Sequence, residues 1–142
     1  MNTETQTPNS EAVTRGIRIS AEAQYLDSES DPSHGRHFYV YRIRITNDGT
    51  ETAQLLSRRW VILDANNRRE EVQGEGVVGK QPKLQAGESF EYTSYCPLRT
   101  SWGTMEGSYA FRTDGGETFE AEVARFFLAP NSANAIVHDS EV

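Results

Sequence analysis

Cysteine is nearly absent from this chain of 142 residues, in which Cys96 is the single thiol. One thiol excludes an internal disulfide and any metal site built from several cysteines. Long apolar runs are absent as well, since no stretch approaches the roughly 18 residues that a membrane-spanning helix requires. Residues 1–13 are polar and lack the apolar segment of a secretory signal. Together these absences predict a cytoplasmic protein with no membrane partner.

Lysine is scarce too, because only Lys80 and Lys83 occur and arginine supplies the other basic residues. The 14 basic residues face 21 acidic ones, which gives a net charge of −7 at pH 7. Phosphate backbones repel such a chain unless its basic residues gather on one face, and no nucleic-acid-binding motif is present. The composition therefore predicts no nucleic-acid partner.

Helical periodicity is the third absence, because no segment of helical length places apolar residues at i, i+3 and i+4. Apolar and polar residues alternate instead, as Ile17, Ile19, Ala21 and Ala23 do, which is typical of half-buried strands. The alternation, bounded by turn residues, predicts strands in the segments 17–24, 37–46, 53–65, 70–74, 90–96, 105–113 and 118–129.

Strands at these spacings predict an all-β fold, an antiparallel β-sandwich of the immunoglobulin or fibronectin type III kind with about seven strands. We expect the domain to span residues 14–128. Residues 1–13, rich in Thr, Asn, Gln and Glu, predict a disordered N-terminal tail. Residues 129–142 lose all periodicity and predict a flexible C-terminal tail.

Three separated motifs carry information beyond the strand pattern. They are QLLSRRWVILDANN at 54–67, EEVQGEGVVGKQPKL at 70–84 and AGESFEYTSYCPLRTSWGTMEGSY at 86–109. In this order they resemble the ApaG family. The resemblance implies a fibronectin type III-like sandwich, found alone in bacteria or as a protein-binding domain of larger proteins. It also implies an association with cobalt resistance and magnesium efflux, and it brings no established catalytic residue.

The glycine-rich run in the second motif resembles a nucleotide-binding signature. Gly74, Gly76 and Gly79 match the spacing G-x-G-x-x-G, but that signature needs a helix after the glycines, and here Pro82 follows closely. Two interpretations stay open. The glycines permit bulges or positive φ angles, or successive N–H groups, helped by Lys80, form a nest for phosphate, pyrophosphate or a nucleotide.

Arginine and tryptophan favour a partner-binding surface, because both are frequent anchors of protein interfaces. Arg58, Arg59 and Trp60 lie on a strand that carries apolar residues on both faces. Such a strand is either covered on two sides or meets a partner with its outer face. Trp102 lies in a predicted loop, where it either contacts a partner or folds back as a lid over one end of the sandwich.

A loop rich in carboxylates is the remaining candidate for ligand binding. Residues 27–31 place an acidic side chain at every second position, as a calcium loop begins, but Pro32 and Phe38 occupy positions that need Gly and Glu. His34 and His37 lie nearby. A solvated acidic loop is the simpler interpretation, and we predict no metal site.

The sequence thus predicts a non-enzymatic module that binds another protein. We expect Cys96 to be a structural thiol, with no catalytic residue and no cofactor. Two alternatives stay open: a binder of phosphate, pyrophosphate or nucleotides through residues 74–80, and an accessory protein that responds to divalent cations.

Overall fold

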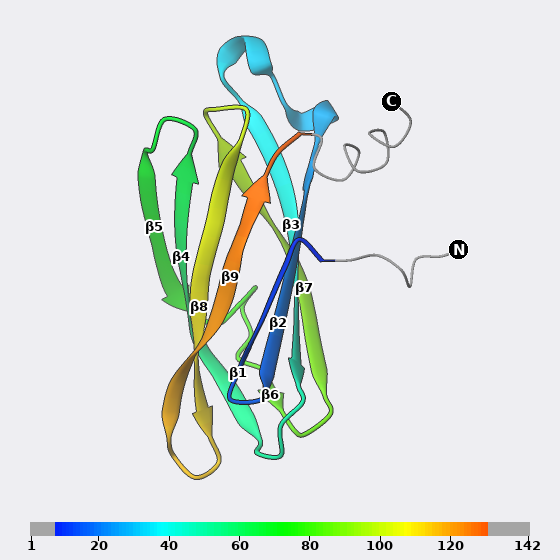
Figure 1. The fold of residues 1–142 in the computed structure, drawn as a ribbon, viewed down its shortest axis with the longest axis vertical. Helices are drawn as coiled ribbons and strands as arrows, with labels where there is room; N and C mark the ends of the chain where they lie inside the picture. Colours follow the sequence, from blue (N-terminus) through cyan, green and yellow to red (C-terminus); the bar gives the residue numbers. More distant parts are fainter. Residues whose placement is uncertain (1–7, 131–142) are drawn as a thin grey trace, which may run out of the picture.

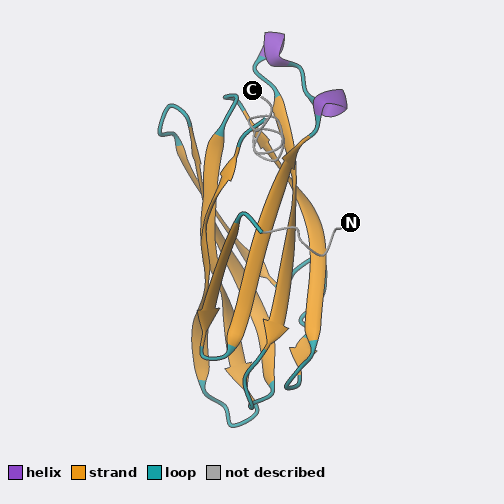
Figure 2. Ribbon diagram, turned by 45° about the vertical axis from the view of Figure 1, so that its right-hand side comes forward, coloured by secondary structure: helices purple, strands orange, loops and turns teal. Residues whose placement is uncertain are grey.

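Residues 8–130 are described by the computed structural model, and they form two antiparallel β-sheets that pack face to face (Figures 1 and 2). One sheet has the strand order β1-β2-β3-β7, and the other has the order β5-β4-β8-β9 with β6 paired to β4. The predicted antiparallel β-sandwich is confirmed. The strands are β1 (Ser10–Thr14), β2 (Ile17–Tyr25), β3 (His37–Asn47), β4 (Ala53–Asp64), β5 (Arg69–Glu75), β6 (Lys83–Leu84), β7 (Ser89–Leu98), β8 (Gly103–Thr113) and β9 (Thr118–Leu128).

The core lies between the two sheets, where the alternating apolar residues meet. In β2 and β3 every second side chain is buried, among them Ile17, Ile19, Tyr39 and Ile43. The residues between them are less buried, because successive side chains of a strand point to opposite faces. The period-two pattern of the sequence therefore determines which side of these strands is dry.

A β-bulge in β4 changes which of its side chains enter the core. The pairing of β4 with β8 shifts by one residue between Leu55 and Ser57. Leu55 is buried, and strict alternation would also turn Arg59 inward, but the extra residue turns Trp60 inward instead. Arg59 is exposed as a result.

The sandwich is closed along one side and open along the other. On the closed side β1 lies against β9, where the Ser10 hydroxyl donates to the Ala124 carbonyl at 2.7 Å and the Glu122 N–H donates to the Thr14 hydroxyl at 3.1 Å. On the open side the sheets end in β5 and β7, each paired with a neighbour on one side only.

The predicted N-terminal boundary of the domain is wrong. Ser10–Thr14 form β1, which pairs with β2 in full register from Ser10 to Thr14, so the domain begins before residue 14. The segment has no clear apolar alternation, and its pairing with β2 and its hydroxyl contacts to β9 order it. With β1 and the two-residue β6 the described residues hold nine strands, two more than the segments that alternation marks.

The remaining predictions about the ends of the chain fall on residues 1–7 and 131–142, which lie outside the described residues. In the part of the chain from residue 8 to residue 130, no helix has the length and apolar character to cross a membrane.

Candidate functional site

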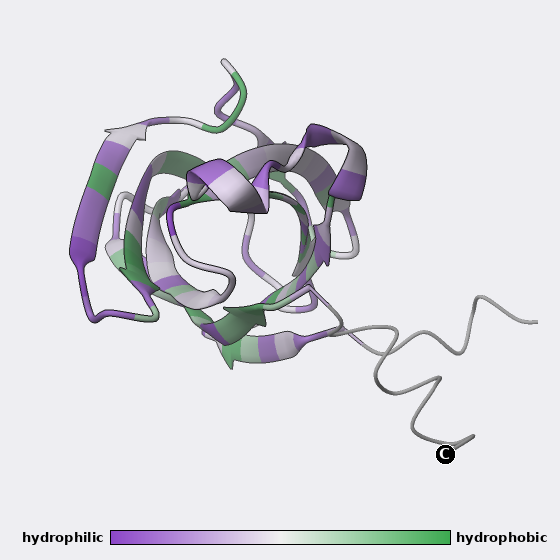
Figure 3. Cartoon of the chain, turned by 90° about the horizontal axis from the view of Figure 1, so that it is seen from above, coloured by the Kyte–Doolittle hydropathy of each residue, from purple (hydrophilic) through white to green (hydrophobic). Residues whose placement is uncertain are grey.

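A groove runs along the open side of the sandwich, between β5 and β7. It consists of two hollows of about 710 Å³ and about 260 Å³ that share Ile62, Glu70 and Pro97. We call these two hollows the edge groove. The smaller one is lined by Val72 of β5, by Tyr95 of β7 and by side chains of the core. Val72 is the one apolar side chain of β5, a strand that Figure 3 draws mostly in the hydrophilic colour.

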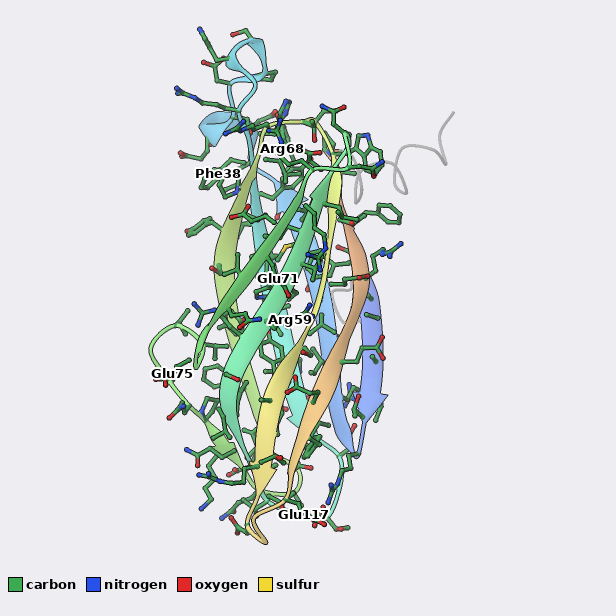
Figure 4. All side chains as sticks on the ribbon, turned by 90° about the vertical axis from the view of Figure 1, so that its left-hand side faces the viewer. Phe38, Arg59, Arg68, Glu71, Glu75 and Glu117 are labelled. Carbon is green, nitrogen blue, oxygen red and sulfur yellow. The ribbon has the colours of Figure 1, made fainter. Side chains whose placement is uncertain are left out.

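Arginine dominates the larger hollow of the edge groove. Arg36, Arg68, Arg69 and Arg99 line it, together with an apolar floor that includes Ile62. Arg36, Arg68 and Arg99 come from three connections at one end of the sandwich: the loop before β3, the turn between β4 and β5, and the loop after β7. Arg69 is the first residue of β5. Figure 4 shows Arg68 at this end, with Phe38 of the same hollow nearby.

Hydrogen bonds from backbone N–H groups to side-chain oxygens hold the turn between β4 and β5 and the loop after β7 in place. One oxygen of the buried Asp64 carboxylate accepts the N–H groups of Asn66 at 2.8 Å and Arg68 at 2.9 Å, which shapes the turn between β4 and β5. The Thr100 hydroxyl accepts the Ala65 N–H at 3.0 Å and so joins that turn to the loop after β7. Two of the three connections that border the hollow are therefore joined to each other.

Three of the four arginines of the larger hollow lack the ion pairs that most of the other arginines form within the described residues. Within the described part of the chain, Arg36, Arg68 and Arg99 form no ion pair, and Arg69 contacts Glu71 at 3.4 Å. Most of the other arginines contact a carboxylate: Arg15, Arg18, Arg42, Arg44, Arg59 and Arg125. Three guanidinium groups at one end of the edge groove are thus available to an anionic ligand.

The structure separates the candidate residues Arg58, Arg59 and Trp60. Trp60 is only 3% exposed and packs edge-on against Tyr41, with ring centroids 5.5 Å apart, so it belongs to the core. Arg58 and Trp60 line the smaller hollow of the edge groove, and a contact of either with a partner stays a prediction. The Arg58 guanidinium donates to the carbonyls of Glu75 and Gly76 at 3.0 and 2.8 Å, which makes it a strut of the β4–β5 pair. Arg59 is exposed and contacts Glu71 (Figure 4).

Trp102 is exposed at the end of the sandwich. Its exposed fraction of 45% favours the interpretation as a contact residue over a lid on the core. Its ring lies 6.4 Å from that of Phe127, which is 57% exposed. Phe127 points outward because a bulge in β9 turns Phe126 into the core. Neither Trp102 nor Phe127 lines the edge groove.

The glycine-rich run forms a tight hairpin turn. Val77 and Lys80 exchange backbone hydrogen bonds of 2.8 and 2.9 Å around Val78 and Gly79, whose positive φ angles are those of a type I′ turn. The Gly76 N–H donates to the Leu56 carbonyl at 2.9 Å. Three N–H groups that an anion nest would need are therefore occupied, which favours the structural interpretation of the glycines.

Gly74 has a different role, since no positive φ is required there. A Cβ at this position would lie 2.7 Å from a guanidinium nitrogen of Arg58, so the glycine lets that side chain cross the strand.

The acidic loop brings one carboxylate and one imidazole together. Asp31 and His34 are 2.8 Å apart, while His37 is buried and its Nδ1 lies 3.2 Å from the Tyr25 hydroxyl. In residues 8–130 no group of three or more His, Cys, Asp or Glu side chains is placed to hold a metal ion. The loop therefore offers two ligands where a stable site needs more.

Cys96 lies in β7 with its side chain in the core. It is 3% exposed, and burial raises the pKa of its thiol to about 12, because the thiolate would lose its solvation. Since the thiolate is the nucleophile, this environment suits a structural thiol.

We expect Cys96 of the native protein to react with iodoacetamide at pH 8 at least ~100-fold more slowly than in 6 M guanidinium chloride, because folding lowers both its ionised fraction and its access. Mass spectrometry of timed samples measures both rates. Native alkylation within about tenfold of the denatured rate would mean that the thiol is activated. The raised pKa of Cys96 also makes the stability of the fold depend on pH. The thiol ionises at a lower pH in the unfolded chain than in the folded one, so the free energy of unfolding falls as the pH rises from about 9 to about 12.

The fold and the edge groove define a small antiparallel β-sandwich with one open side. The model of the ApaG domain family matches residues 27–113 of the chain. The chain belongs to the ApaG family, as the motifs of the sequence predict.

Relatives and a solved structure support this membership. Protein ApaG of Methylorubrum extorquens (strain PA1) is 49% identical over 127 residues, which are 89% of this chain and 98% of the relative. Protein ApaG of Bdellovibrio bacteriovorus is 54% identical over 112 residues, 79% of this chain and 88% of the relative. The crystal structure of an ApaA protein from Bordetella pertussis, 42% identical, superimposes with a TM-score of 0.80 and covers 89% of this chain and 100% of its own.

Proposed function

We propose that the chain is a non-enzymatic protein-binding module that holds its partner in the edge groove. The open side of the sandwich carries this proposal. There β5 and β7 each lack a second neighbouring strand, and a strand edge offers backbone N–H and C=O groups to another chain. The groove between them combines apolar surface with arginine, which are the constituents of interface centres.

An aromatic pair marks the side of the groove that β7 forms. Tyr95 is 60% exposed and lines the smaller hollow, and its ring lies 5.5 Å from that of Phe38, which lines the larger one. An exposed tyrosine beside a groove supports a binding role, because tyrosine contributes large contact area at a small loss of side-chain entropy. The buried thiol of Cys96 supports a role other than nucleophilic catalysis.

Capture of partners from a cell lysate tests the proposal. The full chain, the groove variant Tyr95→Ala and the control Phe127→Ala are immobilised, and bound proteins are quantified by mass spectrometry. The two residues are nearly equally exposed, at 60% and 57%, but only Tyr95 lines the groove. We expect at least one protein to be retained by the wild type and by Phe127→Ala and to fall about tenfold with Tyr95→Ala. The same dependence should hold with the purified partner.

Two outcomes contradict the proposal. Identical captured proteins for all three chains would mean that the groove binds none of them. Loss with Phe127→Ala alone would assign binding to the exposed pair of Trp102 and Phe127.

Several expectations from the sequence stay predictions. They are the roles in divalent-cation response, cobalt resistance and magnesium efflux, the cytoplasmic location, and the finer likeness to fibronectin type III domains.

A further inference from the structure

We propose that the edge groove binds an extended acidic peptide segment, whose carboxylates contact Arg36, Arg68 and Arg99. This inference rests on the proposed function and specifies the chemistry of the partner. It begins from the ion pairs described above, because these three guanidinium groups line one hollow and form no ion pair within the described residues. A hydrogen bond from Ser33 lowers the pKa of the Asp31 carboxyl most, and Arg36 helps to lower it through its charge without contacting it as an ion pair. Guanidinium groups bind carboxylates through paired hydrogen bonds, and their charge is retained at every physiological pH.

The local charge of the larger hollow opposes that of the chain as a whole. The chain carries −7, whereas the hollow is lined by four arginines and by the carboxylates of Glu29, Asp64 and Glu70. The Asp64 carboxylate already accepts two backbone N–H groups. A positively charged rim on an acidic protein favours a complementary acidic partner and accelerates its association.

The strand edges favour an extended conformation of the ligand. Both sides of the groove are the last strands of their sheets. Pro97 in β7 has no N–H group, so β5, with seven residues, is the better edge for a backbone ladder. An added strand would point alternate side chains in opposite directions, so that carboxylates can meet the arginine rim while apolar side chains face the groove.

A compact anion such as phosphate fits the hollow less well. Arg36, Arg68 and Arg99 come from three separate connections, so a ligand that contacts all three must be extended. Phe38, Ile62 and Leu98 also line it, and inorganic phosphate would leave this apolar surface unused. A peptide that alternates acidic and apolar residues uses both kinds of surface.

Selection from a random library of displayed dodecapeptides tests the inference on the full chain. The test uses the wild type and two triple variants. The rim variant combines Arg36→Glu, Arg68→Glu and Arg99→Glu. The control variant combines Arg44→Glu, Lys83→Glu and Arg112→Glu. All six positions are exposed, and none of the control positions lines the groove. Thermal unfolding of each variant verifies that it is folded before binding is measured.

We expect peptides enriched on the wild type to contain an excess of Asp and Glu over the library. Measured by fluorescence anisotropy, their Kd should rise at least about tenfold for the rim variant and change less than about twofold for the control. Added NaCl should weaken the binding, because it screens charge contacts at an exposed rim.

The contrary outcomes separate the two proposals. Enriched peptides without excess acidic residues, whose binding is lost with Tyr95→Ala, would overturn the acidic ligand and leave the binding module intact. Acidic peptides that bind the rim variant as tightly as the wild type would also overturn it. Displacement of the peptides by micromolar pyrophosphate would assign the arginines to a compact anion. Peptide binding that depends on neither Tyr95 nor the arginines would contradict both proposals.

Discussion

Replacing Trp60 with alanine is expected to lower the free energy of unfolding by about 3–5 kcal/mol, which is a large share of the stability of a domain of this size. The indole packs between the two sheets, with its ring centroid 5.5 Å from Tyr41, 6.0 Å from Tyr109 and 6.1 Å from Phe126. Alanine would remove these contacts and leave a cavity that the surrounding strands cannot fill, because they are fixed by pairing on both sides of β4.

The second tryptophan is the matched control for this prediction. Trp102→Ala should change the free energy of unfolding by less than about 1 kcal/mol, since its side chain is already half in water. Urea titrations of both variants measure the difference. If Trp60→Ala does not fold, Trp60→Phe should still show a loss of about 1–2 kcal/mol. Equal losses at the two positions would contradict the assignment of Trp60 to the core.

Tryptophan fluorescence provides a second readout of the same assignment. In Trp102→Ala the remaining indole is Trp60, and we expect blue-shifted emission that acrylamide quenches weakly. In Trp60→Phe the remaining indole is Trp102, and we expect red-shifted emission that acrylamide quenches readily. Both expectations follow from the exposed fractions of 3% and 45%.

Replacing Gly76 with alanine is expected to lower the free energy of unfolding by about 3 kcal/mol. Two effects add at this position. The φ angle of +63° places a side chain in the left-handed region, and a Cβ there would lie 2.4 Å from the Lys80 carbonyl oxygen. That oxygen cannot withdraw freely, because it accepts the Val77 N–H at 2.8 Å within the hairpin turn.

Gly79→Ala separates the two effects. Its φ angle is +80°, but no atom lies within 4 Å of the added Cβ, so we expect only the backbone cost of about 1 kcal/mol. Chemical denaturation of both variants tests the difference, and equal costs would mean that the Lys80 carbonyl is not held in place.

A titration with pyrophosphate tests the same turn for anion binding. The NMR shifts of the amides of residues 76–80 should stay unchanged, whereas an anion nest would shift them as pyrophosphate binds.

The β-sandwich was predictable because its signal is local. In β2 and β3 the spacing of Ile17, Ile19, Tyr39 and Ile43 alone determines the buried face. The burial of Trp60 could not be read from alternation for the same reason. Alternation is counted from residue to residue, and a single bulge in β4 inverts the count for every residue after it. β1 escaped prediction because it has no clear apolar alternation, and its order comes from pairing with β2 and from hydroxyl contacts to β9, a strand that lies far away in the sequence.

The arginine rim was missed for a related reason. Arg36, Arg68 and Arg99 are each isolated in the sequence, and none belongs to a recognisable motif. Each follows or precedes a turn, and in an antiparallel fold every second turn lies at the same end of the sheets. Arginines beside alternate turns were therefore a usable signal, but only the strand order shows that their connections adjoin one hollow.

The sequence by itself determined the antiparallel strands, the turn chemistry, the single thiol and the membership of the ApaG family, because each depends on residue type and spacing along the chain. The tertiary structure alone decided which tryptophan enters the core, which N–H groups the glycine-rich turn occupies, and which three arginines line one hollow without forming an ion pair in the described residues. Those properties depend on strand register and on the packing of one sheet against the other, which bring together residues that are remote in the sequence.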